Sequence, residues 1–160
     1  VISNAAVDIN ENDYLALSSS SIRRLIKFAN TADIKKFLLT SSQATITYGH
    51  DIKKDIFTGL DWTNIDNPRL NDYIKSKTVS EKLAWDLIAS FKNSKLELST
   101  INCGFILGPM LNNQIRGVSG KKLQNLVLNK TFFMPNRFVN YVDVRDIAKL
   151  QVFLNAFFFI

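Results

Sequence analysis

The chain has 160 residues, of which 46% are hydrophobic and 21% charged, as in ordinary globular domains. A single cysteine excludes an internal disulfide bond and a paired-cysteine zinc or redox site, and a single histidine argues against Ser-His-Asp catalysis and histidine-built metal centres. The net charge of +6 comes from basic residues dispersed along the chain, so we expect a solvated surface and no nucleic-acid partner.

We see no signal peptide and no apolar stretch long enough to cross a bilayer. The lone cysteine fits a reducing compartment. We therefore expect a cytoplasmic protein without a membrane partner and without a bound metal. The apolar ends, VIS and AFFFI, lead us to expect a piece of something larger.

The first half of the chain predicts a helix, a strand and a long loop. Asn12 or Asp13 can cap a helix over 14–29, whose Leu25, Ile26 and Ala29 recur at helical spacing. The run KKFLLTSS predicts a short buried strand that ends at Ser42. Residues 48–70 lack any period and contain glycines, a proline, aspartates and asparagines, which indicates a long loop.

The second half predicts two strands and three helices. A strong helix covers 73–91, with its apolar stripe inward and Glu81, Lys82 and Asp86 expected to face water. A strand follows over 95–102 and closes with a turn at Gly104, Gly108 and Pro109. Beyond it we expect a shorter helix near 123–130, a strand over 138–142, and a helix over 144–157 that Asp143 caps. The core side of that last helix is expected to hold Ile147, Ala148, Leu150 and Leu154.

Strands that alternate with helices predict an α/β fold with a parallel, doubly wound sheet. Such sheets bind ligands beyond the carboxyl ends of their strands. Ser42 lies at one such end, and Tyr73 lies at the start of the helix that follows the loop. Lys77 is four residues further on, on the same helical face.

These three side chains could polarise and protonate a carbonyl group. A cation one turn away favours the phenolate and should lower the pKa of Tyr73, and the Ser42 hydroxyl could hold developing alkoxide charge. A nicotinamide cofactor would have to supply the hydride. The alternative is that Tyr73 and Lys77 are an ordinary surface pair, and that Ser41 and Ser42 only satisfy backbone groups at a strand end.

Four stretches, in order, carry a family resemblance: KKFLLTSSQATITYGH, DWTNIDNPRLNDYIKSKTVSEKLAWDLI, LELSTINCGFILGPML and YVDVRDIAKLQ. The chain resembles the extended short-chain dehydrogenase/reductases, and within them the dihydroflavonol 4-reductase-like carbonyl reductases of the NAD-dependent epimerase/dehydratase group. The resemblance implies an incomplete Rossmann-like fold and an oxidoreductase that acts on CH-OH donors or carbonyl acceptors with NADP or NAD, NADP being favoured.

The resemblance also implies residue roles. Ser42 would be the catalytic serine, Tyr73 the acid/base, and Lys77 the residue that lowers the pKa of the tyrosine and binds the nicotinamide ribose. Residues 138–146 would return the chain to the core, with Asp143 and Arg145 in a packing network. The remaining residues implied to bind the cofactor are Val1, Ser3, Thr40, Ser41, Cys103, Gly104, Phe105 and Ile106.

The sequence departs from the family in two ways. Cys103 stands where the family usually has proline, and no Gly-rich turn for the pyrophosphate occurs. We therefore expect residues 1–160 to be a partial dinucleotide-binding domain that reaches the start of the substrate lobe at about residue 104. We also expect it to bind the dinucleotide weakly or not at all by itself.

Several alternatives stay open. A sugar-nucleotide epimerase or a hydroxysteroid dehydrogenase would share the same three residues. A truncated, non-catalytic remnant or binding module would explain the missing Gly-rich turn, and a basic nucleic-acid binder would explain the charge. We expect a small-molecule carbonyl or alcohol substrate and a monomer or homodimer.

Overall fold

The computed structural model of the chain describes residues 13–110, 117–130 and 139–157. Within these residues it divides into two compact units, the first ending at Asn102 and the second beginning at Cys103. Each unit is described by itself.

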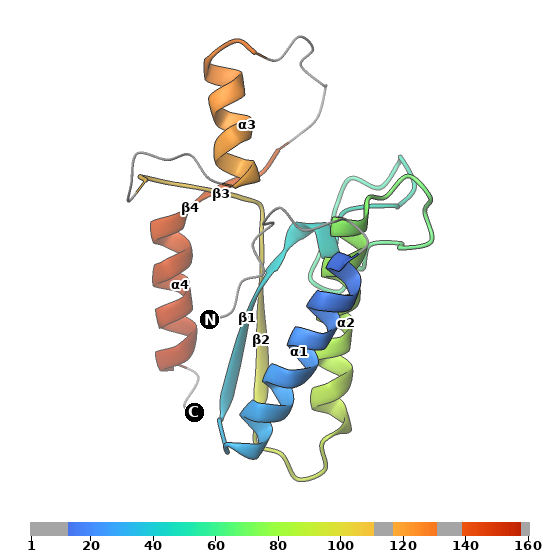
Figure 1. The fold of residues 1–160 in the computed structure, drawn as a ribbon, viewed down its shortest axis with the longest axis vertical. Helices are drawn as coiled ribbons and strands as arrows, with labels where there is room; N and C mark the ends of the chain where they lie inside the picture. The colour runs from blue at the N-terminus through green and yellow to red at the C-terminus, as the bar shows by residue number, and fades with distance from the viewer. Residues whose placement is uncertain (1–12, 111–116, 131–138, 158–160) are drawn as a thin grey trace. The chain divides into compact units, whose positions relative to one another are not determined.

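In the part of the first unit that the structure describes, two α-helices, a short 3-10 helix, two strands and a long loop follow each other (Figure 1). Strands β1 and β2 form a two-stranded sheet and run in the same direction, with α2 as the crossover between them. The helix, strand and helix expected from the sequence are confirmed with shifts of one or two residues at their ends. The elements are α1 (Asp13–Thr31), β1 (Lys36–Ser42), the 3-10 helix η1 (Gln43–Thr45), α2 (Asp72–Ser90) and β2 (Glu97–Cys103).

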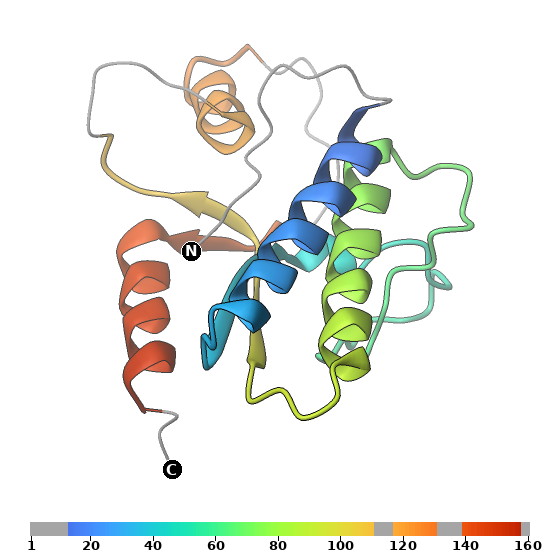
Figure 2. The same ribbon diagram turned by 60° about the horizontal axis from the view of Figure 1, so that its bottom comes forward.

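Helices α1 and α2 pack side by side over one face of this sheet (Figure 2). The buried core contains Ile26 and Ala84, both at 0% exposure, one from each helix. Its other members come from α1, from β1 and from the residue just before β2: Ile22, Ala29, Leu39 and Leu96. This apolar layer fixes α2 against the end of β1, which is where the candidate site lies.

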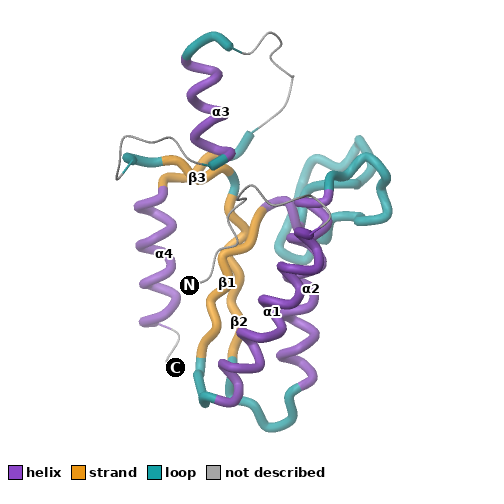
Figure 3. Tube along the Cα trace, viewed as in Figure 1, coloured by secondary structure: helices purple, strands orange, loops and turns teal. Residues whose placement is uncertain are grey.

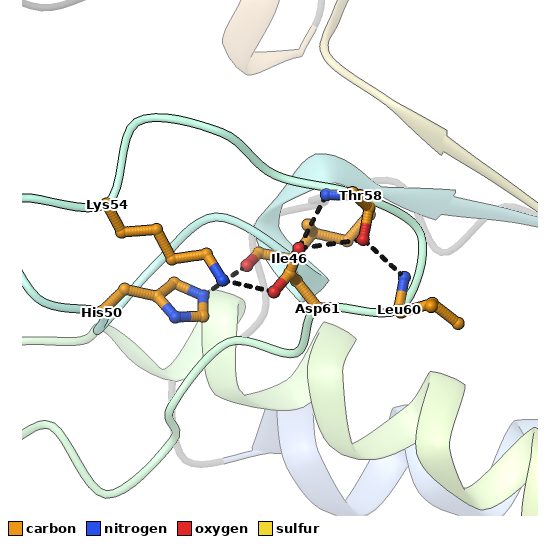
Figure 4. Close-up of polar contacts among 6 residues, drawn as sticks. All are labelled: Ile46, His50, Lys54, Thr58, Leu60 and Asp61. Atoms are coloured by element: carbon orange, nitrogen blue, oxygen red, sulfur yellow. Dashed lines mark hydrogen bonds and ion pairs between the residues drawn. The ribbon is translucent and has the colours of Figure 1, made fainter.

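Residues 46–71 form the expected long loop, and part of it is ordered by its own polar contacts (Figure 4). The Asp61 carboxylate accepts hydrogen bonds from the Thr58 backbone N–H at 2.7 Å and the Thr58 hydroxyl at 3.0 Å, and it pairs with Lys54. Lys54 is the largest cause that lowers the pKa of Asp61 to about 2. His50 Nε2 lies 2.6 Å from the Ile46 carbonyl oxygen.

Thr63 anchors the far end of the same loop to η1. Its side chain donates to the Ala44 carbonyl at 2.7 Å and accepts from the Tyr48 N–H at 3.0 Å, and its own N–H donates to the Thr45 carbonyl at 2.8 Å. Thr63 is 1% exposed. The loop is therefore pinned beside the strand end that carries Ser42.

The second unit contains β3 (Phe105–Leu107), α3 (Val118–Val127), β4 (Tyr141–Asp143) and α4 (Val144–Phe157), as Figure 3 also shows. Strands β3 and β4 pair in parallel, with Ile106 opposite Val142. The sequence predicted only a turn where β3 lies, because its three residues stand between Gly104 and Gly108. A Cβ at position 104 would come within 2.3 Å of the Asn140 carbonyl oxygen, so this close strand approach requires glycine.

The cap of α4 is confirmed, whereas part of its predicted core face is wrong. The Asp143 carboxylate accepts from the Arg145 N–H at 2.8 Å and from the Arg145 guanidinium, which lowers the pKa of Asp143 to about 2. Ile147 is buried, but Ala148 and Leu150 are exposed. Helical spacing identifies an apolar stripe, and the burial of each member depends on what packs against it.

None of the helices within the described ranges is long and apolar enough to cross a membrane.

Candidate active site

Ser42 occupies the junction between β1 and η1. Its extended backbone, with φ −148° and ψ 147°, ends the strand, and its side-chain oxygen accepts a hydrogen bond from the Ala44 N–H at 3.1 Å as the N-cap of η1. Because the Ser42 oxygen already accepts from the backbone, the Ser42 hydroxyl can donate its own proton to a different acceptor. The side chain forms a hydrogen bond with Tyr73.

Tyr73 lies in the first turn of α2, where Asn71 begins the helix by accepting from the Ile74 N–H at 3.0 Å. The aromatic side chain is half-buried. Burial is the largest influence and raises the pKa of Tyr73, while the hydrogen bond with Ser42 lowers it in part. The expected lowering of the Tyr73 pKa is therefore wrong for this structure, because the desolvation of the phenolate outweighs the stabilisation that the Ser42 hydrogen bond gives it.

Lys77 follows one turn later on α2, and its Nζ lies 5.9 Å from the centre of the Tyr73 ring. The cation and the phenol thus share one face of the helix, as their spacing predicted. The structure brings Ser42, Tyr73 and Lys77 together within the first unit. Their roles in catalysis stay predictions.

Glu81 does not face water, so that sequence prediction is wrong. It is 5% exposed, and its carboxylate oxygen Oε2 accepts hydrogen bonds from the Ser41 hydroxyl and from Asn102 Nδ2, the latter at 2.9 Å. The available signal was spacing, since Tyr73, Lys77 and Glu81 follow each other at intervals of four residues on α2. Lys82 instead lies 5.3 Å from the centre of the Trp62 ring, and Asp86 is exposed as expected.

The other residues implied to bind a cofactor fall in three places. Thr40 and Ser41 are buried on β1, where Ser41 turns its hydroxyl to Glu81. In the second unit Cys103 is buried and Ile106 is half-buried. Beside Gly104, the Phe105 N–H donates to the Asn140 carbonyl at 2.8 Å. Val1 and Ser3 lie outside the described residues. All of these cofactor assignments stay predictions.

Comparisons with known proteins find oxidoreductases and reductases similar to this chain. An uncharacterized oxidoreductase of Saccharomyces cerevisiae is 31% identical over 84% of this chain and 42% of its own length. The NADPH-dependent methylglyoxal reductase GRE2 of the same yeast is 26% identical over 89% of this chain and 46% of its own length. Dihydroflavonol 4-reductase of Arabidopsis thaliana is 23% identical over 76% of this chain and 32% of its own length.

The fold agrees. The crystal structure of Gre2 from Candida albicans in complex with NADPH matches with a TM-score of 0.77 and 28% identity, over 98% of this chain and 51% of that one. This chain is a homologue of the Gre2-like reductases. The resemblance to the dihydroflavonol 4-reductase-like branch is confirmed, and so is the incomplete Rossmann-like α/β fold. No family model matches the chain.

The chain spans about half the length, or less, of the Gre2-like reductases it matches. In a Gre2-like fold the carboxyl ends of parallel strands are the ligand-binding edge. Ser42 stands at such an end, next to Tyr73 and Lys77.

Proposed function

We propose that this chain carries the proton-transfer residues of an NADPH-dependent carbonyl reductase. The observation that supports this most is the meeting of Ser42, Tyr73 and Lys77, because the three come from a strand end and from a helix that a long loop separates. The relatives described as NADPH-dependent favour NADPH over NADH. The substrate class is a small aldehyde or ketone, or the corresponding alcohol in the reverse direction.

Tyr73 would act as the general acid. With its pKa raised by burial, the side chain is protonated at neutral pH, which is the form that carbonyl reduction consumes. The phenolic proton goes to the substrate oxygen as a hydride arrives at the carbonyl carbon, and the product is an alcohol. The phenolate then recovers a proton from solvent.

Ser42 would hold the substrate oxygen. Its own oxygen already accepts the Ala44 N–H, so its hydroxyl proton is directed either to the Tyr73 oxygen or to a carbonyl oxygen placed beside it. Donation to the growing negative charge on that oxygen stabilises the transition state more than the ground state.

The donor set at Tyr73 and Lys77 fits a nicotinamide dinucleotide. The three N–H donors of the Lys77 ammonium can hydrogen-bond to ribose hydroxyls, and the positive charge can stabilise the phenolate that forms after proton transfer. NADPH, when bound, supplies the hydride that no side chain can provide. Thr40, Ser41 and residues 103–106 are assigned to its surroundings by family resemblance.

We also propose that the first compact unit belongs to the dinucleotide-binding domain and that the substrate lobe starts at about residue 104. The division of the chain after Asn102 supports this boundary. A cytoplasmic location and a monomeric or homodimeric state complete the proposal.

The test is carbonyl-dependent consumption of NADPH by the intact gene product, with a panel of small aldehydes and ketones. Tyr73→Phe removes one hydroxyl and keeps the ring, and we expect kcat/KM to fall by about 100-fold or more. Ser90→Ala is the control, since it also removes one hydroxyl from α2, at an exposed position, and we expect wild-type activity from it. A Tyr73→Phe protein as active as the wild type would contradict the proposal.

A further inference from the structure

A buried polar network lies directly behind Ser42 and joins three elements of the first unit. Glu81 of α2 accepts from the Ser41 hydroxyl of β1 and from Asn102 Nδ2 of β2. Asn102 Nδ2 also donates to Thr45 Oγ1 of η1 at 2.8 Å. The helix that carries Tyr73 is thereby tied to the strand end that carries Ser42.

The network ends on the backbone of Ser42. Thr45 Oγ1 donates to the Ser42 carbonyl at 2.9 Å, and Asn102 Nδ2 lies 3.4 Å from the same oxygen. Ser42 is therefore held on two sides: its carbonyl by Thr45 and Asn102, and its side chain by the Ala44 N–H. Any shift of these partners would move the Ser42 hydroxyl relative to the Tyr73 phenol.

Because these groups are buried, leaving any of them without a hydrogen-bond partner would cost free energy of folding. Thr45 is 0% exposed and Glu81 5% exposed, and a buried carboxylate is costly unless donors satisfy it. An apolar residue of similar size could fill the same space on α2 without that cost. A carboxylate here is explained by its ability to accept from two separate elements at a single oxygen, which fixes their relative position.

We propose that Glu81 is a positioning residue that sets the Ser42 hydroxyl against Tyr73 through Ser41, Asn102 and Thr45. The catalytic meaning of this assignment rests on the proposed function, whereas the geometry does not. Glu81 acts through its partners and is not expected to touch substrate.

The experiment compares Glu81→Ala and Glu81→Gln in the intact gene product. The alanine variant removes the acceptor, so we expect kcat for carbonyl reduction to fall by roughly 10- to 100-fold with KM for NADPH unchanged. The glutamine variant keeps an oxygen that can accept both donors, and we expect it to restore most of the lost rate. Glu97→Ala is the matched control, because Glu97 is exposed on β2.

A second readout follows Tyr73 itself by NMR titration of carbon-13-labelled tyrosine, with Tyr73→Phe to assign its signal. Because the Ser42 hydrogen bond lowers the pKa of Tyr73, we expect Glu81→Ala to raise that pKa further and Glu81→Gln to leave it near the wild-type value. This titration tests the geometry even if the wild-type protein reduces no carbonyl, so failure of the proposed function is distinguishable from failure of this inference.

A folded Glu81→Ala protein with wild-type kcat and wild-type Tyr73 titration would overturn the inference, and so would a Glu81→Gln protein as impaired as the alanine variant. Thr45→Val provides an independent test with little change of shape. It removes the donor to the Ser42 carbonyl and the acceptor for Asn102, so we expect the same direction of change in both readouts. An unchanged rate together with an unchanged titration in Thr45→Val would equally overturn it.

Discussion

Two opposing influences act on the Tyr73 hydroxyl. Burial against the surrounding protein disfavours the phenolate, and the Ser42 hydrogen bond favours it. Burial prevails, so the phenol is a weaker acid than a free tyrosine, and it would give up its proton only to a substrate oxygen that becomes strongly basic as negative charge develops on it. A raised pKa keeps the Tyr73 hydroxyl protonated at neutral pH, as a proton donor requires. The acidity of this hydroxyl then depends on the position of the Ser42 side chain.

The raised pKa of Tyr73 predicts a specific dependence of stability on pH. A group whose pKa is higher in the folded state contributes stability that is fully present below its unfolded pKa of about 10, and that is lost as pH rises through the folded value. We therefore expect the free energy of unfolding of the wild type to fall relative to that of Tyr73→Phe above about pH 10. Urea denaturation at a series of alkaline pH values measures this difference, and a constant gap between the two proteins would count against it.

Sequence spacing identified Tyr73 and Lys77 correctly as neighbours, because two residues four positions apart lie on the same face of a helix. It failed for Glu81, where charge was taken as a sign of exposure. What buries Glu81 is the pair of donors from Ser41 and Asn102, which lie 40 and 21 residues away along the chain. Contacts of this kind depend on how strands and helix are brought together, and a single sequence carries little sign of them.

The loop between η1 and α2 shows how a segment without regular structure can be held in place. Asp61 accepts two hydrogen bonds from Thr58 and forms an ion pair with Lys54 (Figure 4). Thr63 connects the same segment to η1 through its hydrogen bond to the Ala44 carbonyl. The sequence predicted the loop from its glycines and polar residues. It did not predict this order, because each bond joins residues several positions apart whose pairing is set by the path of the backbone.

Asp61 gives a test of that order. Asp61→Asn removes the charge that pairs with Lys54, so we expect faster tryptic cleavage at Lys53 and Lys54 under native conditions. Acidification should loosen the same loop, because the contribution of a carboxylate with a lowered pKa is present above about pH 4 and is lost as pH falls through about 2; NMR of the loop amides measures this in acid, where trypsin is inactive. Asp66→Asn, at an exposed position of the same loop, should cleave like the wild type. Equal cleavage of all three proteins would show that Asp61 does not order the loop.

Helices were easier to predict than strands in this chain. The apolar stripe of α2 and the cap at Asp143 locate two helices within one residue of their observed ends. Strand β3 was missed because three residues between glycines carry no alternating pattern, and its pairing with β4 depends on residues more than thirty positions away. Exposure of Leu150 on α4 has the same origin, since packing partners decide which part of a stripe is covered.

At the level of the whole chain, two compact units carry different parts of the proposed enzyme. The first holds Ser42, Tyr73, Lys77 and the network around Glu81, and the second holds residues 103–106 and the parallel pair β3–β4. The sequence motifs, the fold and the relatives all indicate homology to the Gre2-like reductases. The chain spans about half the length, or less, of those relatives, and carbonyl reductase activity is our proposal for it.

The most direct measurement uses NADPH deuterated at the nicotinamide C4 position that is transferred, together with an aldehyde that the intact gene product reduces. Mass spectrometry of the alcohol reports hydride transfer, and its rate in Ser42→Ala reports the hydroxyl that holds the oxygen. The account predicts one deuterium on the carbinol carbon and a rate roughly 100-fold lower in Ser42→Ala than in the wild type or in Ser90→Ala, an exposed serine of α2. An alcohol without deuterium, or a Ser42→Ala protein as fast as the wild type, would contradict it.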